Sequence, residues 1–185
     1  NILNISSVAR DCSVERKVVE NYFSILEDLL MAYRVPVFTK KAKRRLVEHP
    51  KFYLFDVGVY RTVRPMGPLD QPEEAEGISL ETLLFQELLA MNGYLGLGYK
   101  IFYWRTASGL EVDFILYGPR GLRALEIKRT GKVTGAMLKG LKAFLEDYPE
   151  AKAYFIYGGE RRLYFDKIEV IPIHEVLKNL EEVFK

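Results

Sequence analysis

Three charged residues interrupt two apolar stretches in the second half of the 185-residue chain. Asp113 lies inside the run Val-Asp-Phe-Ile-Leu, and Glu126 and Lys128 flank Ile127 in the next apolar run. Residues two apart on an extended strand share a face, so Glu126 and Lys128 are expected to point the same way. A turn at 118–121 would bring Asp113 beside Glu126 on the neighbouring strand.

This arrangement predicts metal chemistry. A buried charge is costly unless it is paired or bound to a metal, and two converging carboxylates repel each other. Mg²⁺ or Mn²⁺ would relieve that repulsion, since both prefer hard oxygen ligands. We expect the ion to bind Asp113, Glu126 and the backbone carbonyl of Ile127, and to activate water for phosphodiester hydrolysis. Lys128 would then orient the water or stabilise developing charge.

Asp113 followed by Glu-Ile-Lys at 126–128 resembles the core motif of the PD-(D/E)xK nuclease superfamily, which includes restriction endonucleases and archaeal Holliday junction resolvases. The resemblance implies a further catalytic glutamate on a preceding helix, which would reach the metal through water. Glu81 matches that position because it lies in the first turn of the expected helix, and Glu87 is the rival. Val112 stands where the family often has proline.

A wider resemblance covers nearly the whole chain. Residues 103–106 (Tyr-Trp-Arg-Thr), 108–114 and 138–142 are similar to the C-terminal region of archaeal and bacterial AAA-superfamily ATPases. In that family an ATPase module precedes a winged helix and a nuclease-like domain. The sequence has no G-x-x-x-x-G-K-[ST] motif, so the resemblance implies a partner ATPase module upstream of Asn1 in the same polypeptide. We interpret the chain as a fragment of a longer protein.

The elements around the motif predict a mixed α/β sheet, or α+β fold, with a PD-(D/E)xK core in residues 79–185. Apolar alternation and turn signals predict strands at 100–105, 111–117, 122–129, 151–157 and 168–173. Helices are expected at 79–92, 134–148 and 174–184.

The first 65 residues predict a small winged-helix subdomain. A short helix at 4–12 and a longer one at 14–31, with Ser13 as its N-cap, are expected to precede two strands at 33–38 and 51–55. The second helix begins with mixed charges, which favours packing over sequence-specific DNA reading. A stretch rich in proline, glycine and acidic residues at 66–78 predicts a linker.

Charge is unevenly distributed, although the formal net charge is only +2. Basic residues gather in the first third of the chain, including Thr-Lys-Lys-Ala-Lys-Arg-Arg at 39–45. This run is either a solvated surface or a weak phosphate contact. Arg105 and Arg129, near the expected site, either meet phosphate or cover the acidic pair.

Other kinds of site have little support. The single cysteine, Cys12, excludes an internal disulfide and is expected to be a buried small apolar residue. His49 and His174 stand alone, without zinc-ligand spacing. No membrane-spanning run, signal peptide or small-molecule motif is visible, and a cytoplasmic location is expected.

Two functions remain open. One is a Mg²⁺-dependent DNA endonuclease domain of an AAA-type ATPase, favoured by the complete set Asp113, Glu126, Lys128 and Glu81. The other is a catalytically silent module that binds nucleic acid or protein for that ATPase. The acidic balance of residues 66–185 favours the second.

Overall fold

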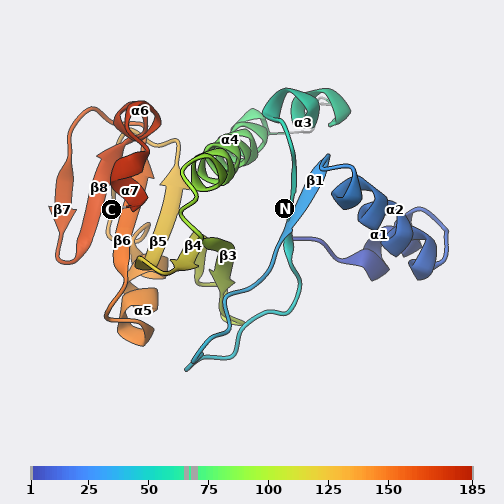
Figure 1. Ribbon diagram of the computed structural model, residues 1–185, viewed down its shortest axis with the longest axis horizontal. Helices are drawn as coiled ribbons and strands as arrows, with labels where there is room; N and C mark the ends of the chain where they lie inside the picture. Colours follow the sequence, from blue (N-terminus) through green and yellow to red (C-terminus); the bar gives the residue numbers. More distant parts are fainter. Residues whose placement is uncertain (1, 65–66, 68–70, 185) are drawn as a thin grey trace.

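The computed structural model describes residues 2–64, 67 and 71–184. Its largest element is a six-stranded mixed sheet of order β3-β4-β5-β6-β8-β7 (Figure 1). The strands β3, β4 and β5 form an antiparallel meander, β5, β6 and β8 are parallel, and β7 is an antiparallel edge. Their bounds are β3 Lys100–Arg105, β4 Glu111–Gly118, β5 Gly121–Lys128, β6 Lys152–Tyr157, β7 Leu163–Phe165 and β8 Ile168–Pro172. The predicted mixed α/β sheet is confirmed.

Helices cover both faces of this sheet, so its central strands are apolar on both sides. The helices are α4 (Pro72–Tyr94), α5 (Lys139–Asp147), α6 (Ile173–Lys178) and α7 (Glu181–Phe184). Phe114 and Leu125 pack in the core that includes α4, α6 and α7, whereas Ile115 and Ala124 pack in the core that includes α5. No helix of the described residues is long and apolar enough to cross a membrane.

The N-terminal region contains two helices and a strand pair, in the order that the sequence predicts. These elements are α1 (Ile5–Asp11), α2 (Arg16–Asp28), β1 (Ala32–Val35) and β2 (Lys51–Leu54), followed by a further helix, α3 (Val57–Val63). The expected N-cap is wrong, because Glu15 precedes α2 while Ser13 has a positive φ of 54° in the preceding turn. Cys12 is exposed rather than buried, since it caps the C-terminal end of α1.

The connection between β1 and β2 packs along the rest of the molecule. Val37 bridges Tyr103 of β3, and Leu46 bridges Thr106. Within the basic run, Arg44 forms an ion pair of 3.1 Å with Asp147 at the end of α5. Arg44 therefore has an acidic partner within the chain.

The predicted linker is partly helical. Residues 72–78 form the first two turns of α4, with Pro72 at the start of the helix. The linker prediction is therefore wrong for this part, and residues 66 and 68–70 lie outside the described residues. Because α4 begins at Pro72, Glu81 lies in its third turn rather than its first.

Candidate active site

Six charged side chains gather where β2, α4, β4 and β5 meet. Four are carboxylates and two are lysines: Glu81, Glu111, Asp113, Glu126, Lys51 and Lys128. The structure thus brings together Asp113, Glu126, Lys128 and Glu81, the four residues that the sequence singles out. We call these six residues the charge cluster.

Asp113 and Glu126 lie where β4 and β5 stop pairing. The ladder between the two strands ends at Phe114 and Leu125, which are adjacent in sequence to Asp113 and Glu126 respectively. Beyond this point side chains replace the ladder: the Ile127 N–H donates to Asp113 Oδ2 at 3.0 Å, and the Asp113 N–H donates to Glu126 Oε2 at 3.3 Å. These bonds fix both carboxylates, because each one accepts from the backbone of the opposite strand.

A change of register in β4 accompanies this arrangement. Phe102 pairs with Ile115 and Trp104 with Val112, so Asp113 and Phe114 together oppose Tyr103. Two residues opposite one is the pattern of a β-bulge, which redirects side chains and is frequent next to active sites. The bulge accounts for a charged residue within an otherwise apolar strand.

Lys128 joins the two carboxylates at the open end of the cluster. Its Nζ lies 2.7 Å from Glu126 Oε1 and 3.5 Å from Asp113 Oδ2. Its side chain is 42% exposed, whereas that of Asp113 is 2% exposed. Solvent therefore reaches Lys128, whereas the Asp113–Glu126 pair behind it is buried.

Lys51 lies at the other, buried end of the charge cluster. Its place there was not predicted from the sequence. Its side chain is 3% exposed, and its Nζ lies 2.6 Å from Glu111 Oε1, 3.0 Å from Asp113 Oδ1 and 3.5 Å from Glu81 Oε2. Nothing local to β2 marks this lysine, because its partners follow it by 30 residues or more in the sequence. Glu111 was also missed, although it stands two residues before Asp113 and strand alternation could have indicated it.

The structure distinguishes the two glutamates proposed for the helix. Glu81 accepts a hydrogen bond of 3.1 Å from the Tyr53 hydroxyl and pairs with Lys51. Glu87 is exposed. The helix carboxylate of the cluster is therefore Glu81, and it faces Lys51 and Tyr53.

The pKa values of the carboxyl groups in the cluster are shifted in different directions. Burial, with the negative charge of Asp113, raises the pKa of Glu126 to about 8. Burial also acts on Asp113, but Lys51, Lys128 and the Ile127 N–H outweigh it and lower the pKa of Asp113. Burial and Asp113 raise the pKa of Glu81. Asp113 thus holds the stable negative charge, and Glu126 carries a proton at neutral pH.

A divalent cation fits one part of the cluster. The Lys128 ammonium already lies between the oxygens of Asp113 and Glu126, so a cation is accommodated at this point. Mg²⁺ commonly binds through one or two carboxylates and retains several waters, so this pair with the Ile127 carbonyl suits it. Among residues 2–64, 67 and 71–184, no three carboxylate, imidazole or thiol groups could hold a metal ion together. The ligand role expected for Glu81 therefore lacks support.

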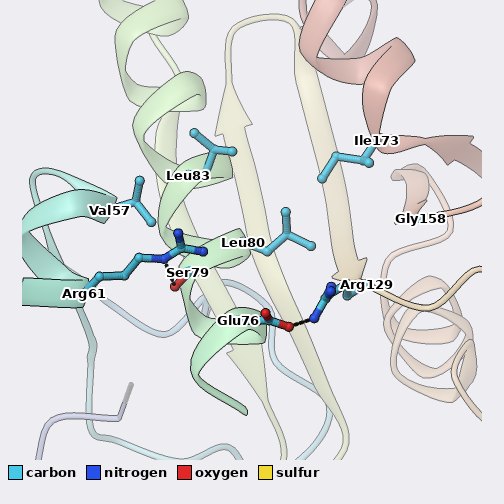
Figure 2. A pocket seen from close by; sticks show the side chains of 9 residues that line it. All are labelled: Val57, Arg61, Glu76, Ser79, Leu80, Leu83, Arg129, Gly158 and Ile173. Atoms are coloured by element: carbon cyan, nitrogen blue, oxygen red, sulfur yellow. Dashed lines mark hydrogen bonds and ion pairs between the residues drawn. The ribbon is translucent and has the colours of Figure 1, made fainter. Parts of the chain in front are cut away.

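Figure 2 shows a cavity of about 380 Å³ whose lining includes neighbours in sequence of two cluster residues, but none of the six themselves. Glu76, Ser79, Leu80 and Leu83 of α4 form one wall, and Leu80 directly precedes Glu81. The rest of the lining is Val57, Arg61, Arg129, Gly158 and Ile173. The last three of these residues follow the carboxyl ends of β5, β6 and β8, where open sheets with parallel strands commonly bind ligands.

The two arginines expected near the site have acidic partners. Arg105 pairs with Glu111 at 2.9 Å, and so covers one carboxylate of the cluster. Arg129 pairs with Glu76 across the cavity, and Arg61 donates to the Ser79 hydroxyl at 3.3 Å (Figure 2). The side chain of Arg129 is 63% exposed, so it remains accessible to a phosphate.

Comparison with known proteins identifies relatives of the chain but does not indicate an activity. The chain is 24% identical over 177 residues to Uncharacterized protein Rv2008c of Mycobacterium tuberculosis and to Uncharacterized protein Mb2031c of Mycobacterium bovis. Each alignment covers 93% of this chain but only 38% of the relative, so the chain spans well under half their length.

Two protein families match different parts of the chain. The family described as Domain of unknown function (DUF8612) matches residues 1–70. Residues 76–176, which include all of the charge cluster except Lys51, match the Domain of unknown function (DUF4143). By this match, which covers more than half its length, the chain belongs to the DUF4143 family.

Proposed function

We propose that the chain is the nuclease-like part of an AAA-type ATPase, and that it cleaves DNA phosphodiester bonds with the help of Mg²⁺ or Mn²⁺. The contact of Lys128 with both Asp113 and Glu126 carries this proposal. It unites a carboxylate pair and an ammonium at a point that solvent reaches. The association with an ATPase rests on the sequence resemblance.

Asp113, Glu126 and the backbone carbonyl of Ile127 would hold the ion. The bound ion would supply Lewis-acid stabilisation of a phosphoryl oxygen and a more acidic water. Glu126 must lose its proton to become a ligand, so metal binding releases a proton at neutral pH. The Ile127 N–H keeps Asp113 in place throughout.

Lys128 would act on the substrate side. Its ammonium leaves the carboxylates once their charge is compensated, and its partly exposed side chain can reach a phosphate oxygen or the attacking water. Arg129, the next residue, offers a second positive charge at the edge of the cavity.

A nicking assay on supercoiled and branched DNA with Mn²⁺ tests the proposal. Wild-type protein should nick the DNA, and Asp113→Asn should not. Calorimetric titration with Mn²⁺ should show one ion bound to the wild type and a much weaker ion for Asp113→Asn. Equal Mn²⁺ affinity in the two proteins would rule out this site. Because the ATPase module belongs to the proposal, the assay is run with and without it.

The second candidate is a catalytically silent module that binds a protein for the ATPase. It is favoured because Lys51 and Lys128 already compensate the charge of Asp113. Exposed apolar side chains along α2 and just after it offer a surface for such a partner: Val18, Tyr22, Ile25, Leu29 and Leu30. Absence of nicking under all the conditions above, with the ATPase module present, would select this function.

A further inference from the structure

Two arginines reach the cavity of Figure 2 from different elements. Arg61 belongs to α3, and Arg129 directly follows β5. Each contacts α4: Arg61 donates to the Ser79 hydroxyl at 3.3 Å, and Arg129 pairs with Glu76 (Figure 2). Residues three apart on a helix lie on the same face, so Glu76 and Ser79 hold the two guanidinium groups at neighbouring points of the cavity wall.

The lining of the cavity carries a positive charge. Among the described residues that line it, Arg61 and Arg129 are basic and Glu76 is acidic. Glu76 pairs with Arg129, whereas the side-chain partner of Arg61 within residues 2–64, 67 and 71–184 is the uncharged Ser79. One guanidinium charge is therefore not compensated by a carboxylate. Arginine binds anions with paired N–H donors, so an anion suits this point.

The backbone on both sides of the cavity is fixed. The Val57 N–H donates to the Gln86 side chain of α4 at 3.1 Å, which attaches the start of α3 to α4. The Gly158 N–H donates to the carbonyl of Thr130 at 2.9 Å, and a side chain at Gly158 would collide with the backbone of Arg129. Donors that are already positioned reduce the entropy lost when a ligand binds.

The rest of the cavity suits a small, largely apolar group. Its volume of about 380 Å³ is near the lower end of the range of about 300–1,000 Å³ that is common for small-molecule sites. In the view of Figure 2, three apolar side chains lie above the ion pair between Glu76 and Arg129, so the polar and apolar parts of the lining are separated. The apolar lining residues are Val57, Leu80, Leu83 and Ile173.

Phosphate matches the anionic end of such a ligand better than a carboxylate does. The two guanidinium groups come from different elements, and each has a fork of N–H donors. A carboxylate presents two oxygens in one plane, whereas a phosphate monoester presents three in different directions and can meet both forks. The cavity also lies at the carboxyl ends of parallel strands, where open sheets commonly bind ligands.

We propose that this cavity binds a phosphate monoester of about the size of a nucleotide, with its phosphate between Arg61 and Arg129 and its organic part against the apolar lining. A free nucleotide and the phosphorylated end of a DNA strand share this chemistry. Ser79 orients Arg61, and Glu76 competes with the phosphate for Arg129. None of the six cluster residues lines the cavity, so the proposal does not rest on metal-dependent cleavage.

Calorimetric titration of the full chain with thymidine 5′-monophosphate tests the site; the base of this nucleotide carries an apolar methyl group. EDTA removes divalent cations. We expect one nucleotide per chain, and at least about tenfold weaker binding by Arg61→Met, because a charged donor is lost. Glu76→Gln should bind about 3–10-fold more tightly, since it removes a negative charge beside the phosphate. Arg10→Met, which removes an exposed arginine outside the cavity, should bind like the wild type.

Further ligands identify the source of the phosphate. Inorganic phosphate should bind at least about tenfold more weakly than the nucleotide, because it lacks the apolar contacts. Tighter binding of a 5′-phosphorylated oligothymidylate than of the same strand without that phosphate would show that the site accepts DNA ends. Equal binding of the two strands, with nucleotide binding retained, would assign the site to free nucleotides.

Three results would overturn the proposal. They are no saturable nucleotide binding by the wild type and Glu76→Gln, equal affinity of the wild type and Arg61→Met, and weaker binding by Glu76→Gln. The last result would show that the pair of Glu76 with Arg129 is only structural. Nicking requires a metal ion and nucleotide binding in EDTA does not, so failure of this proposal is distinguishable from failure of the proposed cleavage.

Discussion

The two ends of the charge cluster use the same residue type in opposite ways. Lys51 is 3% exposed and has three carboxylate partners, whereas Lys128 is 42% exposed and has two. The Lys51 end resembles a structural ion pair, because its ammonium is buried among three carboxylates. The Lys128 end retains access to solvent. The difference suggests that one lysine maintains the site and the other acts in it.

The largest expected effect comes from removing the buried cation. Lys51→Met should lower the free energy of unfolding by about 3–5 kcal/mol, because it leaves buried carboxylates without their partner. Lys128→Met should cost less than about 1 kcal/mol, since the Lys128 side chain is partly solvated and Glu126 already carries a proton at neutral pH. Urea unfolding of both variants measures the two free energies. Equal losses would contradict the distinction between the two ends.

The second prediction concerns cleavage. If the cluster cuts DNA, Lys128→Ala should slow nicking by about 10²–10³-fold while the fold is retained, because one preorganised electrostatic group is lost. Nicking rates and circular dichroism spectra of the two proteins check this. Lys132→Ala, in the exposed loop beyond β5, is the matched control and should cut at the wild-type rate. Unchanged cutting by Lys128→Ala would assign the activity to another site.

The third prediction uses the raised pKa of Glu126. The folded protein binds this proton up to about pH 8, whereas the unfolded chain releases it near the usual glutamate value. Glu126 therefore stabilises the fold fully below the unfolded pKa, and this contribution is lost as pH rises towards about 8. The slope should be at most about 1.4 kcal/mol per pH unit.

Urea unfolding at several pH values in this window measures that slope. Glu126→Gln should reduce it, because glutamine does not titrate. Exposed Glu87→Gln should leave it unchanged. Asp113 does not mask the effect, since its lowered pKa places its own titration below the window. A slope that persists in Glu126→Gln would show that another group is responsible.

The smallest effect is expected outside the cluster. Arg44 pairs with Asp147 and Glu146, which attaches the β1–β2 connection to α5. Arg44→Ala should lower the free energy of unfolding by about 0.5–1 kcal/mol. Arg10→Ala, whose pair with Asp11 is fully accessible, should change it by less. Chemical unfolding of both variants measures the difference between a partly covered ion pair and an exposed one.

Local sequence patterns predicted one half of the cluster well. Asp113, Glu126 and Lys128 could be placed together because strand alternation and a short turn determine their neighbours. Glu111 was open to the same reasoning. Lys51 was not, because 62 residues separate it from Asp113 and only tertiary packing brings them together. Local patterns thus predict strands and pairs of residues on adjacent strands. They do not predict which charged residues distant in the sequence form ion pairs.

The linker was mispredicted for a physical reason. Proline and acidic residues are typical of linkers, but they are also favoured at the first turn of a helix. Pro72, Glu73 and Glu74 occupy that turn of α4. Composition alone could not separate the two possibilities, because the apolar residues that pack the helix lie further along the chain.

The position of Lys51 affects how fragments of this protein should be designed. The DUF4143 match covers residues 76–176, while Lys51 lies in the segment that matches DUF8612. An excised fragment cut between the two matches would keep Glu81, Glu111 and Asp113 but lose their ammonium. Such a fragment should be less stable than the full chain, because its buried carboxylates lack their cationic partner. A fragment that begins before Lys51 would keep the cluster complete.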